Sequence, residues 1–336
     1  MNYVTAASLL LVASSFANPQ QAFASDPFYQ GKQIQLIVGT AAGQDYDIWA
    51  RIIARHLGDH LAGSPKIIVE DMPGAGHIIA TNYLYNKAAH DGTVLGMVTR
   101  NIVESAVLQA SGVRFDPTRF NWIGSPELSH RVLLASSQSG IMHPEDLFQR
   151  ELVVGATGGA QGVTTAPILL KNVAGFKIKV VEGYHAPRDV VLAMQRGEVG
   201  GLVDTIGGPK DPRRNWVASG SMRILFNMER EPVPDFDAPS LFQYLKTDKQ
   251  RQVFGFLASS MELGRPLFAP PGLPAKRVGE LRRAFRETMA DPGFRKQVED
   301  SGFELTYRSG QDLATRVAAT METPQAVAKL AQNAAR

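Results

Sequence analysis

The sequence predicts an α/β fold with two lobes, because short apolar runs and Gly-containing loops alternate with helical patterns along the chain. Residues 34–38 form an apolar run, the loop 39–46 contains glycine, and the apolar positions of 47–61 recur at helical spacing. The same order of strand, loop and helix begins again at residues 152–154. A length of 336 residues fits two domains of ~150 residues each, so we expect one lobe from each set of units.

In the first lobe, Asp47 is expected to cap the first helix, since aspartate is favoured at helix N-termini. The next strand is expected at 67–69, and the turn 73–76 leads into a helix that ends near Ala88. A third strand is expected at 94–98. The strands of these units are expected to be mostly parallel.

The second lobe is expected to contain the loop 155–162, a helix at 163–173, a strand at 178–181 and a helix at 187–196. The chain is expected to cross between lobes at the apolar segments 131–135 and 253–258. Lobe 1 then comprises 25–135 plus 257–336, and lobe 2 comprises 136–256. The tail is expected to be helical at 275–289, 292–300 and 311–320 and to pack on lobe 1.

Residues 1–24 have the features of an export signal. They carry no charge, their apolar run is shorter than the ~20 residues that span a bilayer, and Ala22-Phe23-Ala24 is typical of a cleavage site. A Lys or Arg near the start is missing, and the alternative is a buried N-terminal helix. We expect an exported, periplasmic protein.

The composition excludes several classes of function. There are no cysteines, so thiol nucleophiles and Cys-based metal sites are excluded. The 35 basic and 32 acidic residues give a net charge of +3, and the basic residues are scattered, which argues against nucleic-acid binding. We expect no cofactor and a monomeric protein.

Two loops are candidate anion sites, because each joins a strand to a helix N-terminus, where free N–H groups and the helix dipole favour a carboxylate. The first contains Ala42, Gly43, Gln44, Asp45, Tyr46 and Asp47. The second contains Thr157, Gly158, Gly159 and Gln161. A carboxylate at Asp45 would repel an anionic ligand unless it points away. The alternative for the first loop is a tight turn with a capping aspartate.

Other readings of the sequence are less consistent with its motifs. The loop 155–162 followed by Glu182 imitates a dinucleotide site and keeps an NAD(P)-dependent oxidoreductase as an alternative, although the glycines lack G-x-G-x-x-G spacing. His56 and His60 are four residues apart, as metal ligands can be, but the dipole of a helix C-terminus favours histidines without any metal. No G-x-S-x-G motif is present, so a serine hydrolase is not expected.

Arg100 is the expected charged contact to a ligand. It follows the third strand directly, at the carboxyl edge where open α/β sheets bind ligands, and its planar fork can hold a carboxylate. Arg188, at the start of a helix in the second lobe, is the reserve. The alternative is that Arg100 is a solvated loop residue.

Several segments together resemble the Bug family, the substrate-binding proteins of tripartite tricarboxylate transporters. Residues 42–51 resemble the family pattern AGG-x-x-D-x-x-A-R, and residues 69–76 resemble V-x-N-x-P-G-A-G. Further ordered matches lie at 90–94, at 183–186 with Tyr184, at 197–204 with Asp204, and at 268–274. Gln44 stands in place of the second glycine, and Asp45 and Tyr46 replace smaller residues, so the first loop is bulkier and more acidic.

The resemblance implies a periplasmic-binding-protein type II fold with a ligand cleft between two lobes. It implies that the chain captures a small organic carboxylate for the membrane subunits of a transporter and is not an enzyme. A ligand-binding sensor partner is the remaining alternative. Tyr184 and Asp204 are expected at the site only on the strength of this resemblance.

Overall fold

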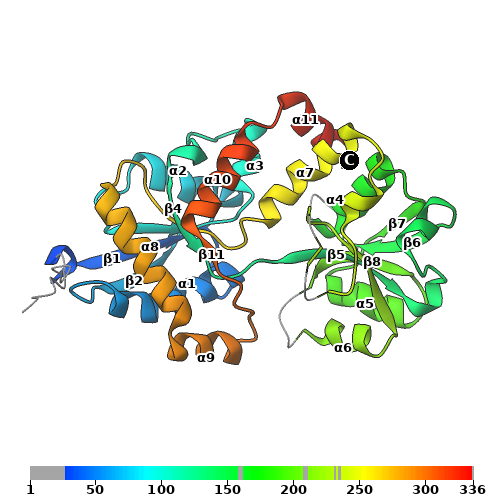
Figure 1. Cartoon of the computed structure of the whole chain (residues 1–336), viewed down its shortest axis with the longest axis horizontal. Helices are drawn as coiled ribbons and strands as arrows, with labels where there is room; N and C mark the ends of the chain where they lie inside the picture. The colour runs from blue at the N-terminus through cyan, green and yellow to red at the C-terminus, as the bar shows by residue number, and fades with distance from the viewer. Residues whose placement is uncertain (1–26, 158–161, 207–210, 231, 234–235, 335–336) are drawn as a thin grey trace, which may run out of the picture.

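The computed structural model describes residues 27–157, 162–206, 211–230, 232–233 and 236–334 (Figure 1). The expected export signal at 1–24 lies outside the described residues. Within them the chain forms two α/β bodies, each built around its own sheet. We call the body around the six-stranded sheet the first body and that around the five-stranded sheet the second body.

The first sheet has the strand order β11-β4-β10-β3-β1-β2. Its strands are β1 (Gln33–Val38), β2 (Lys66–Asp71), β3 (Val94–Met97), β4 (Asn121–Ser125), β10 (Leu267–Ala269) and β11 (Arg308–Ser309). The three strands predicted from apolar runs, β1 to β3, are parallel, whereas β10 and β11 pair antiparallel with their neighbours.

Helices cover both faces of the first sheet. On β1, Ile34 and Leu36 face a core shared with α1 (Asp45–His56), α8 (Ala275–Ala290) and α9 (Pro292–Asp300). Ile37 points the other way, into a core shared with α2 (Ile78–Asn86), α3 (Ile102–Val107) and α10 (Gly310–Met321). Alternate side chains of a strand point to opposite faces of the sheet, so β1 contributes to both cores. A shift of β1 by one residue would exchange the two sets of side chains.

The second sheet has the order β7-β6-β8-β5-β9. Its strands are β5 (His130–Ser136), β6 (Leu152–Ala156), β7 (Ile178–Glu182), β8 (Gly201–Ile206) and β9 (Met222–Asn227). One face packs on α4 (Gly162–Leu169) and α7 (Asp248–Met261), and the other on α5 (Pro187–Gln195) with part of α6 (Pro212–Ala218). β6 is parallel to β7 and β8, as predicted for the repeated units, and β5 is the one strand of this sheet that runs antiparallel to its neighbours, β8 and β9.

The structure changes three local predictions. β5 spans His130–Ser136 inside the second sheet, so the chain crosses before residue 130 and not at 131–135. The second expected crossing, 253–258, is not among the changes, because it lies within α7, which bridges the bodies. The helix predicted at 163–173 ends as an α-helix at Leu169 and continues as a π-turn over Leu170–Ala174. Asp47 is the third residue of α1, not its cap, because the N-cap position belongs to Gln44. Which residues move together as a lobe remains a prediction.

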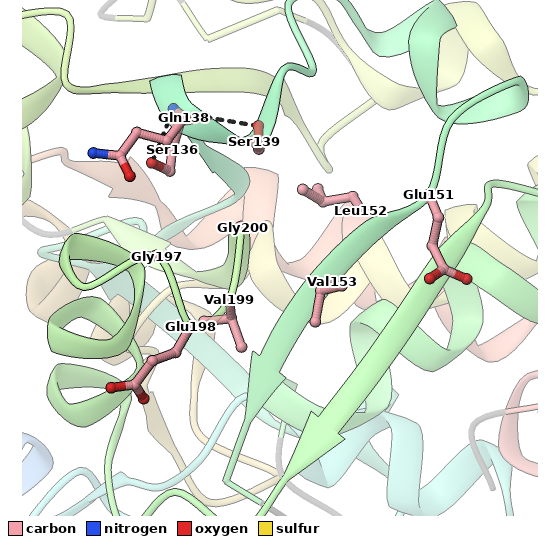
Figure 2. A pocket seen from close by; sticks show the side chains of 10 residues that line it. All are labelled: Ser136, Gln138, Ser139, Glu151, Leu152, Val153, Gly197, Glu198, Val199 and Gly200. Atoms are coloured by element: carbon pink, nitrogen blue, oxygen red, sulfur yellow. Dashed lines mark hydrogen bonds between the residues drawn. The ribbon is translucent and has the colours of Figure 1, made fainter.

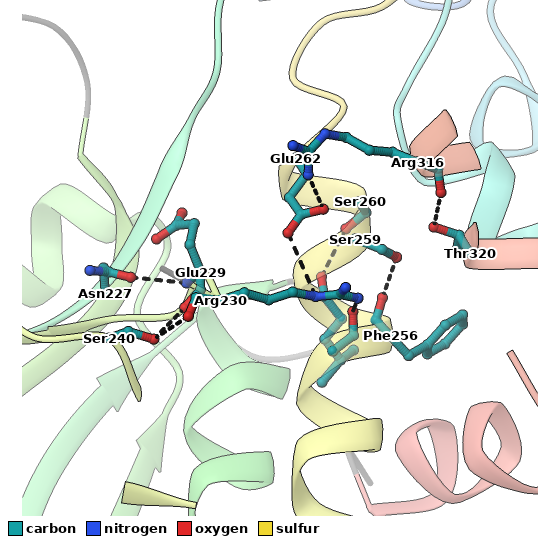
Figure 3. Close-up of polar contacts among 12 residues, drawn as sticks. Asn227, Glu229, Arg230, Ser240, Phe256, Ser259, Ser260, Glu262, Arg316 and Thr320 are labelled. Carbon is teal, nitrogen blue, oxygen red and sulfur yellow. Dashed lines mark hydrogen bonds and ion pairs between the residues drawn. The ribbon is translucent and has the colours of Figure 1, made fainter. Parts of the chain in front are cut away.

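Besides the crossing into β5, the helices α7 and α11 (Gln325–Ala334) bridge the bodies. The first is α7, whose C-terminal Glu262 lies 2.6 Å from Nη1 of Arg316 on α10 and 3.7 Å from Nε of Arg230, which follows β9 (Figure 3). The second is α11, whose first residue donates to the Val107 carbonyl of α3. Its last carbonyl accepts from Asn172 of the second body. The described end of the chain therefore spans both bodies.

Candidate functional site

The first predicted loop folds back onto the start of α1. The N–H of Gly43 donates to Oδ2 of Asp47 over 2.7 Å, and Nε of Arg51 lies 2.7 Å from the other oxygen. Hydrogen bonds from Arg51 and Gly43 lower the pKa of Asp47, although burial, the largest influence, opposes them. The Gly43 N–H is therefore occupied inside the loop. The N–H groups of Asp45 and Tyr46, in the first turn of α1, have no intrahelical acceptor and are the donors that remain for a ligand.

Arg265 offsets the negative charge of Asp45, which would otherwise repel an anionic ligand from this loop. Its Nη2 lies 3.1 Å from Asp45, and its Nε lies 2.5 Å from Oε2 of Glu127. The Trp49 indole N–H donates to the same Glu127 oxygen over 2.9 Å, and the guanidinium lies 5.0 Å from the centre of the Tyr46 ring. Asp45 therefore adds less negative charge to the loop than its sequence position indicates.

His77 adds a neutral side chain beside the loop. Its Nδ1 accepts the Thr99 N–H over 3.0 Å, and its ring meets the Tyr46 ring edge-on at 5.5 Å. Burial lowers the pKa of His77 to about 4, so the ring is neutral at pH 7. Because Nδ1 is an acceptor, the proton is assigned to Nε2, which makes His77 a hydrogen-bond donor at that atom. Gly39 lacks a side chain where the ring lies, since a Cβ there would be 2.2 Å from Nδ1.

Arg100 lies next to the first loop, as the topology predicts. It follows β3, and its backbone N–H donates to the Tyr46 hydroxyl over 3.3 Å. The side chain is partly exposed, and no acidic group of the described residues lies within ion-pair distance of it. The structure thus brings Tyr46, Asp47 and Arg100 together at the carboxyl edge of the first sheet.

A second arginine, Arg131 on β5, approaches from the second body. Burial and then the like charge of Arg100 lower the pKa of Arg131, while the carboxyl groups of Glu104, Asp204 and Glu229 oppose that effect. Burial raises the pKa of Glu104 on α3, against the hydrogen bond from Ser260 and the charges of the two arginines. The junction of the two bodies therefore holds two cations and a carboxyl group whose charged form is disfavoured.

The second predicted loop is only partly described. Thr157 directly follows β6 and is partly exposed, whereas Gly158, Gly159 and Gln161 lie outside the described residues. Tyr184 donates its backbone N–H to the Ala156 carbonyl, and its ring packs over Gly155. Tyr184 is therefore a neighbour of the loop at the end of β6, as the resemblance implies.

Asp204 and Arg188 belong to the second body, on β8 and at the start of α5. Asp204 accepts from Nη1 of Arg213 over 2.6 Å, and Arg213 also forks onto Asp211, so this carboxylate anchors α6. Arg188 is 87% exposed in its side chain. Both line a cavity of about 470 Å³ between α5 and α6, with Leu192 and Trp216 among its apolar walls. The ligand contacts expected of Arg188 and Asp204 stay predictions.

Another cavity, of about 240 Å³, lies at the opposite edge of the second sheet (Figure 2). It is bounded by Leu152 and Val153 at the start of β6 and by the turn 197–200, and it includes the carboxylates of Glu151 and Glu198. None of the described candidate residues lines it. Ligands of open α/β sheets bind at the carboxyl ends of the strands, so this cavity at the amino end is not the predicted site.

Three contributors were missed by sequence reasoning: His77, Arg131 and Arg265. Arg131 carries a weak signal, a charge at the head of the apolar run 131–135. His77 directly follows the turn 73–76, which marks a loop near the sheet edge. Arg265 has no local signal, because its partner Asp45 is 220 positions away in the chain.

The two histidines four residues apart have a structural explanation. His56 lies 3.8 Å and His60 3.7 Å from oxygens of Asp291, the N-cap residue of α9, so they join the end of α1 to that helix. Within the described residues, no group of three or more His, Cys, Asp or Glu side chains could hold a metal ion. A search of the same residues finds no helix with the length and apolar character needed to cross a bilayer.

The chain was compared with known proteins. The family model described as "Tripartite tricarboxylate transporter family receptor" (TctC) matches residues 49–331. A UPF0065 protein of the gbd 5' region of Cupriavidus necator is 26% identical over 326 residues, covering 93% of this chain and 90% of the relative.

Two solved structures have the same fold. A TctC solute-binding protein from Polaromonas is 16% identical with a TM-score of 0.71, covering 91% of this chain and 99% of that one. MatC from Rhodopseudomonas palustris, solved with bound malate, is 20% identical with a TM-score of 0.55, covering 88% and 99%. The two-sheet architecture is thus the periplasmic-binding-protein type II fold that the sequence predicts. Since the family model spans most of its length, the chain belongs to the TctC family of tripartite tricarboxylate transporter receptors.

Proposed function

We propose that this receptor captures a small organic carboxylate between its two bodies, in the periplasm, and presents it as a monomer to the membrane subunits of a tripartite transporter. The observation that carries the proposal is the position of Arg100. Its cationic side chain has no acidic partner within ion-pair distance among the described residues, and its backbone touches Tyr46 in the first turn of α1.

The chemistry of the first body suits an anion. The N–H groups of Asp45 and Tyr46 lie at the positive end of the helix dipole, and the charge of Asp45 is offset by Arg265. His77 adds a neutral donor at Nε2. MatC, which shares the fold, is described with bound malate, and this supports a carboxylic acid of similar size as the solute.

The remaining ligand contacts are proposed from the second body. Thr157 and the residues after it, Gly158, Gly159 and Gln161, would close the site from the end of β6. Tyr184 would support them from its place over Gly155. In the first body, Ala42 and Gln44 are exposed on the loop and would border the ligand.

The test starts with a thermal-shift screen of protein lacking residues 1–24 against malate, succinate, adipate, citrate, aromatic acids, amino acids and NAD(P). A ligand that binds the folded state raises the melting temperature by mass action. Calorimetry then measures its dissociation constant. Binding of NAD(P) with no binding of any carboxylate would overturn the proposal in favour of the oxidoreductase.

The role of Arg100 is tested with Arg100→Ala and Arg100→Lys. A charge-assisted contact contributes about 1.5–3 kcal/mol, so the alanine variant should bind about ten- to a hundredfold more weakly. Lysine keeps the charge but loses the planar fork, and should recover part of the affinity. A folded Arg100→Ala protein that binds within about twofold of wild type would show that Arg100 is a solvated surface residue.

A further inference from the structure

The guanidinium of Arg131 is held at the place where the chain enters the second body. Its backbone is fixed on both sides, since its N–H donates to Oε1 of Glu229 over 3.2 Å and its carbonyl accepts from Met228 over 2.8 Å. The side chain shares the sheet face of Leu133 and Ala135, which packs on α4 and α7. It reaches the first residue of α4, where a Cβ on Gly162 would lie 2.4 Å from Nη2. Gly162 therefore leaves the space that the guanidinium fills.

The charges around Arg131 do not balance within the described residues. Asp204 is committed to Arg213, and the Glu229 oxygen that bonds the backbone of Arg131 lies 3.4 Å from Nδ1 of His130. No described acidic side chain lies within ion-pair distance of the Arg131 guanidinium, and none of the described residues hydrogen-bonds to it. Arg100 adds a like charge from the first body.

The start of α4 adds to this imbalance. The N-terminus of a helix carries partial positive charge, so a cation against Gly162 is repelled by the helix as well as by Arg100. Glu104, the acidic residue of α3 that faces both arginines, is disfavoured in its charged form by burial. An anion placed here would balance the positive charges of Arg131, Arg100 and the N-terminus of α4.

We propose that Arg131 is a second anion-binding residue of the site, and that a carboxylate of the solute lies between its guanidinium and Arg100, joining the two bodies through the ligand. This inference rests on the proposed function and adds a residue from the crossing strand to it. In this arrangement the negative charge of the solute attracts an arginine of each body and so stabilises the contact between the bodies. A neutral solute would leave both arginines repelling one another.

The test compares wild type with Arg131→Gln, Arg131→Lys and Gly162→Ala, each titrated calorimetrically with malate, succinate and adipate. Arg131→Gln should weaken binding about ten- to a hundredfold, and Arg131→Lys should recover part of the loss. Gly162→Ala keeps every charge but displaces the guanidinium, and should weaken binding about fivefold or more. Arg196→Gln, whose side chain is 69% exposed, is the matched control and should bind as wild type.

A second measurement separates ligand binding from structural support. Removing a cation that lacks a partner should leave the melting temperature of ligand-free Arg131→Gln equal to or above that of wild type, while the ligand-induced rise is lost. Small-angle scattering should show that malate compacts the wild type but not this variant.

The outcomes are distinguishable. If none of the three acids binds wild type and the wider screen finds no other carboxylate, the proposed function fails and this inference fails with it. If Arg100→Ala loses binding while Arg131→Gln and Gly162→Ala bind within about twofold of wild type, the inference alone is overturned. If Arg131→Gln fails to fold or melts earlier, normal binding by Gly162→Ala identifies Arg131 as a structural support.

Discussion

Replacing Arg265 by methionine should destabilise the first body by about 3 kcal/mol at pH 7. The Arg265 side chain is 13% exposed and its partner Glu127 is 8% exposed, with Nε and Oε2 2.5 Å apart. Removing one member of a buried ion pair costs about 3–5 kcal/mol, because the other charge is left buried. The contact with Asp45, which is 65% exposed, contributes at most about 1 kcal/mol.

The assay is urea unfolding followed by tryptophan fluorescence, since Trp49 donates to Glu127 and reports on this contact directly. The double variant Glu127→Gln/Arg265→Met should recover about 2 kcal/mol of the loss, because the amide still accepts the Trp49 N–H and no charge remains buried. Lys296→Met removes an ion pair whose members are 76% and 60% exposed, and should unfold at the same urea concentration as wild type. A loss below about 1 kcal/mol for Arg265→Met at pH 7, or a double variant no more stable than Arg265→Met alone, would refute the reasoning.

Two further predictions concern backbone space and titration. Gly310→Ala should destabilise the protein by about 2 kcal/mol in urea unfolding, because a Cβ would lie 2.1 Å from the Trp122 carbonyl oxygen; Gly279→Ala, where no atom lies within 4 Å, should be neutral or stabilising by up to about 1 kcal/mol. His77→Asn keeps an acceptor for the Thr99 N–H and suits the positive φ of 73°. Since the wild-type pKa is lowered to about 4, the unfolded state binds more protons between pH 4 and about 6.5, so wild-type stability falls on acidification through that window. In His77→Asn the melting temperature should fall less than in wild type between about pH 6.5 and pH 4. An equal fall in both proteins would contradict a neutral His77 with a lowered pKa.

The elements that could be predicted are those whose own residues carry the pattern. The apolar runs at 34–38 and 152–154 match the bounds of β1 and β6 to within two residues. They could be predicted because a strand that is buried on both faces consists mostly of apolar residues. β10 and β11 are three and two residues long and exist only through pairing with β3 and β4. Nothing in their local sequence distinguishes them from loops.

The same division applies to the candidate site. The place of Arg100 follows from topology alone, because the end of a parallel strand is fixed by the run that precedes it. The return of Asp47 onto the Gly43 N–H depends on a turn with φ of +82° at Gly43, and Arg265 reaches Asp45 across the fold. Arg131 was expected in a connection, and only the pairing of β5 with β8 places it on a buried sheet face.

The strand order of the first sheet also determines how the chain must assemble after synthesis. β10 lies between β3 and β4, and Asn121, the first residue of β4, donates to the Pro270 carbonyl, 149 positions later. The first sheet is therefore split into two unjoined parts until residue 269 has emerged from the ribosome. The second sheet, from His130 to Asn227, is contiguous and complete by then. Synthesis from the N-terminus therefore completes the second sheet before the first, and the edge of β3 that faces β10 stays unpaired until residues 267–269 are made.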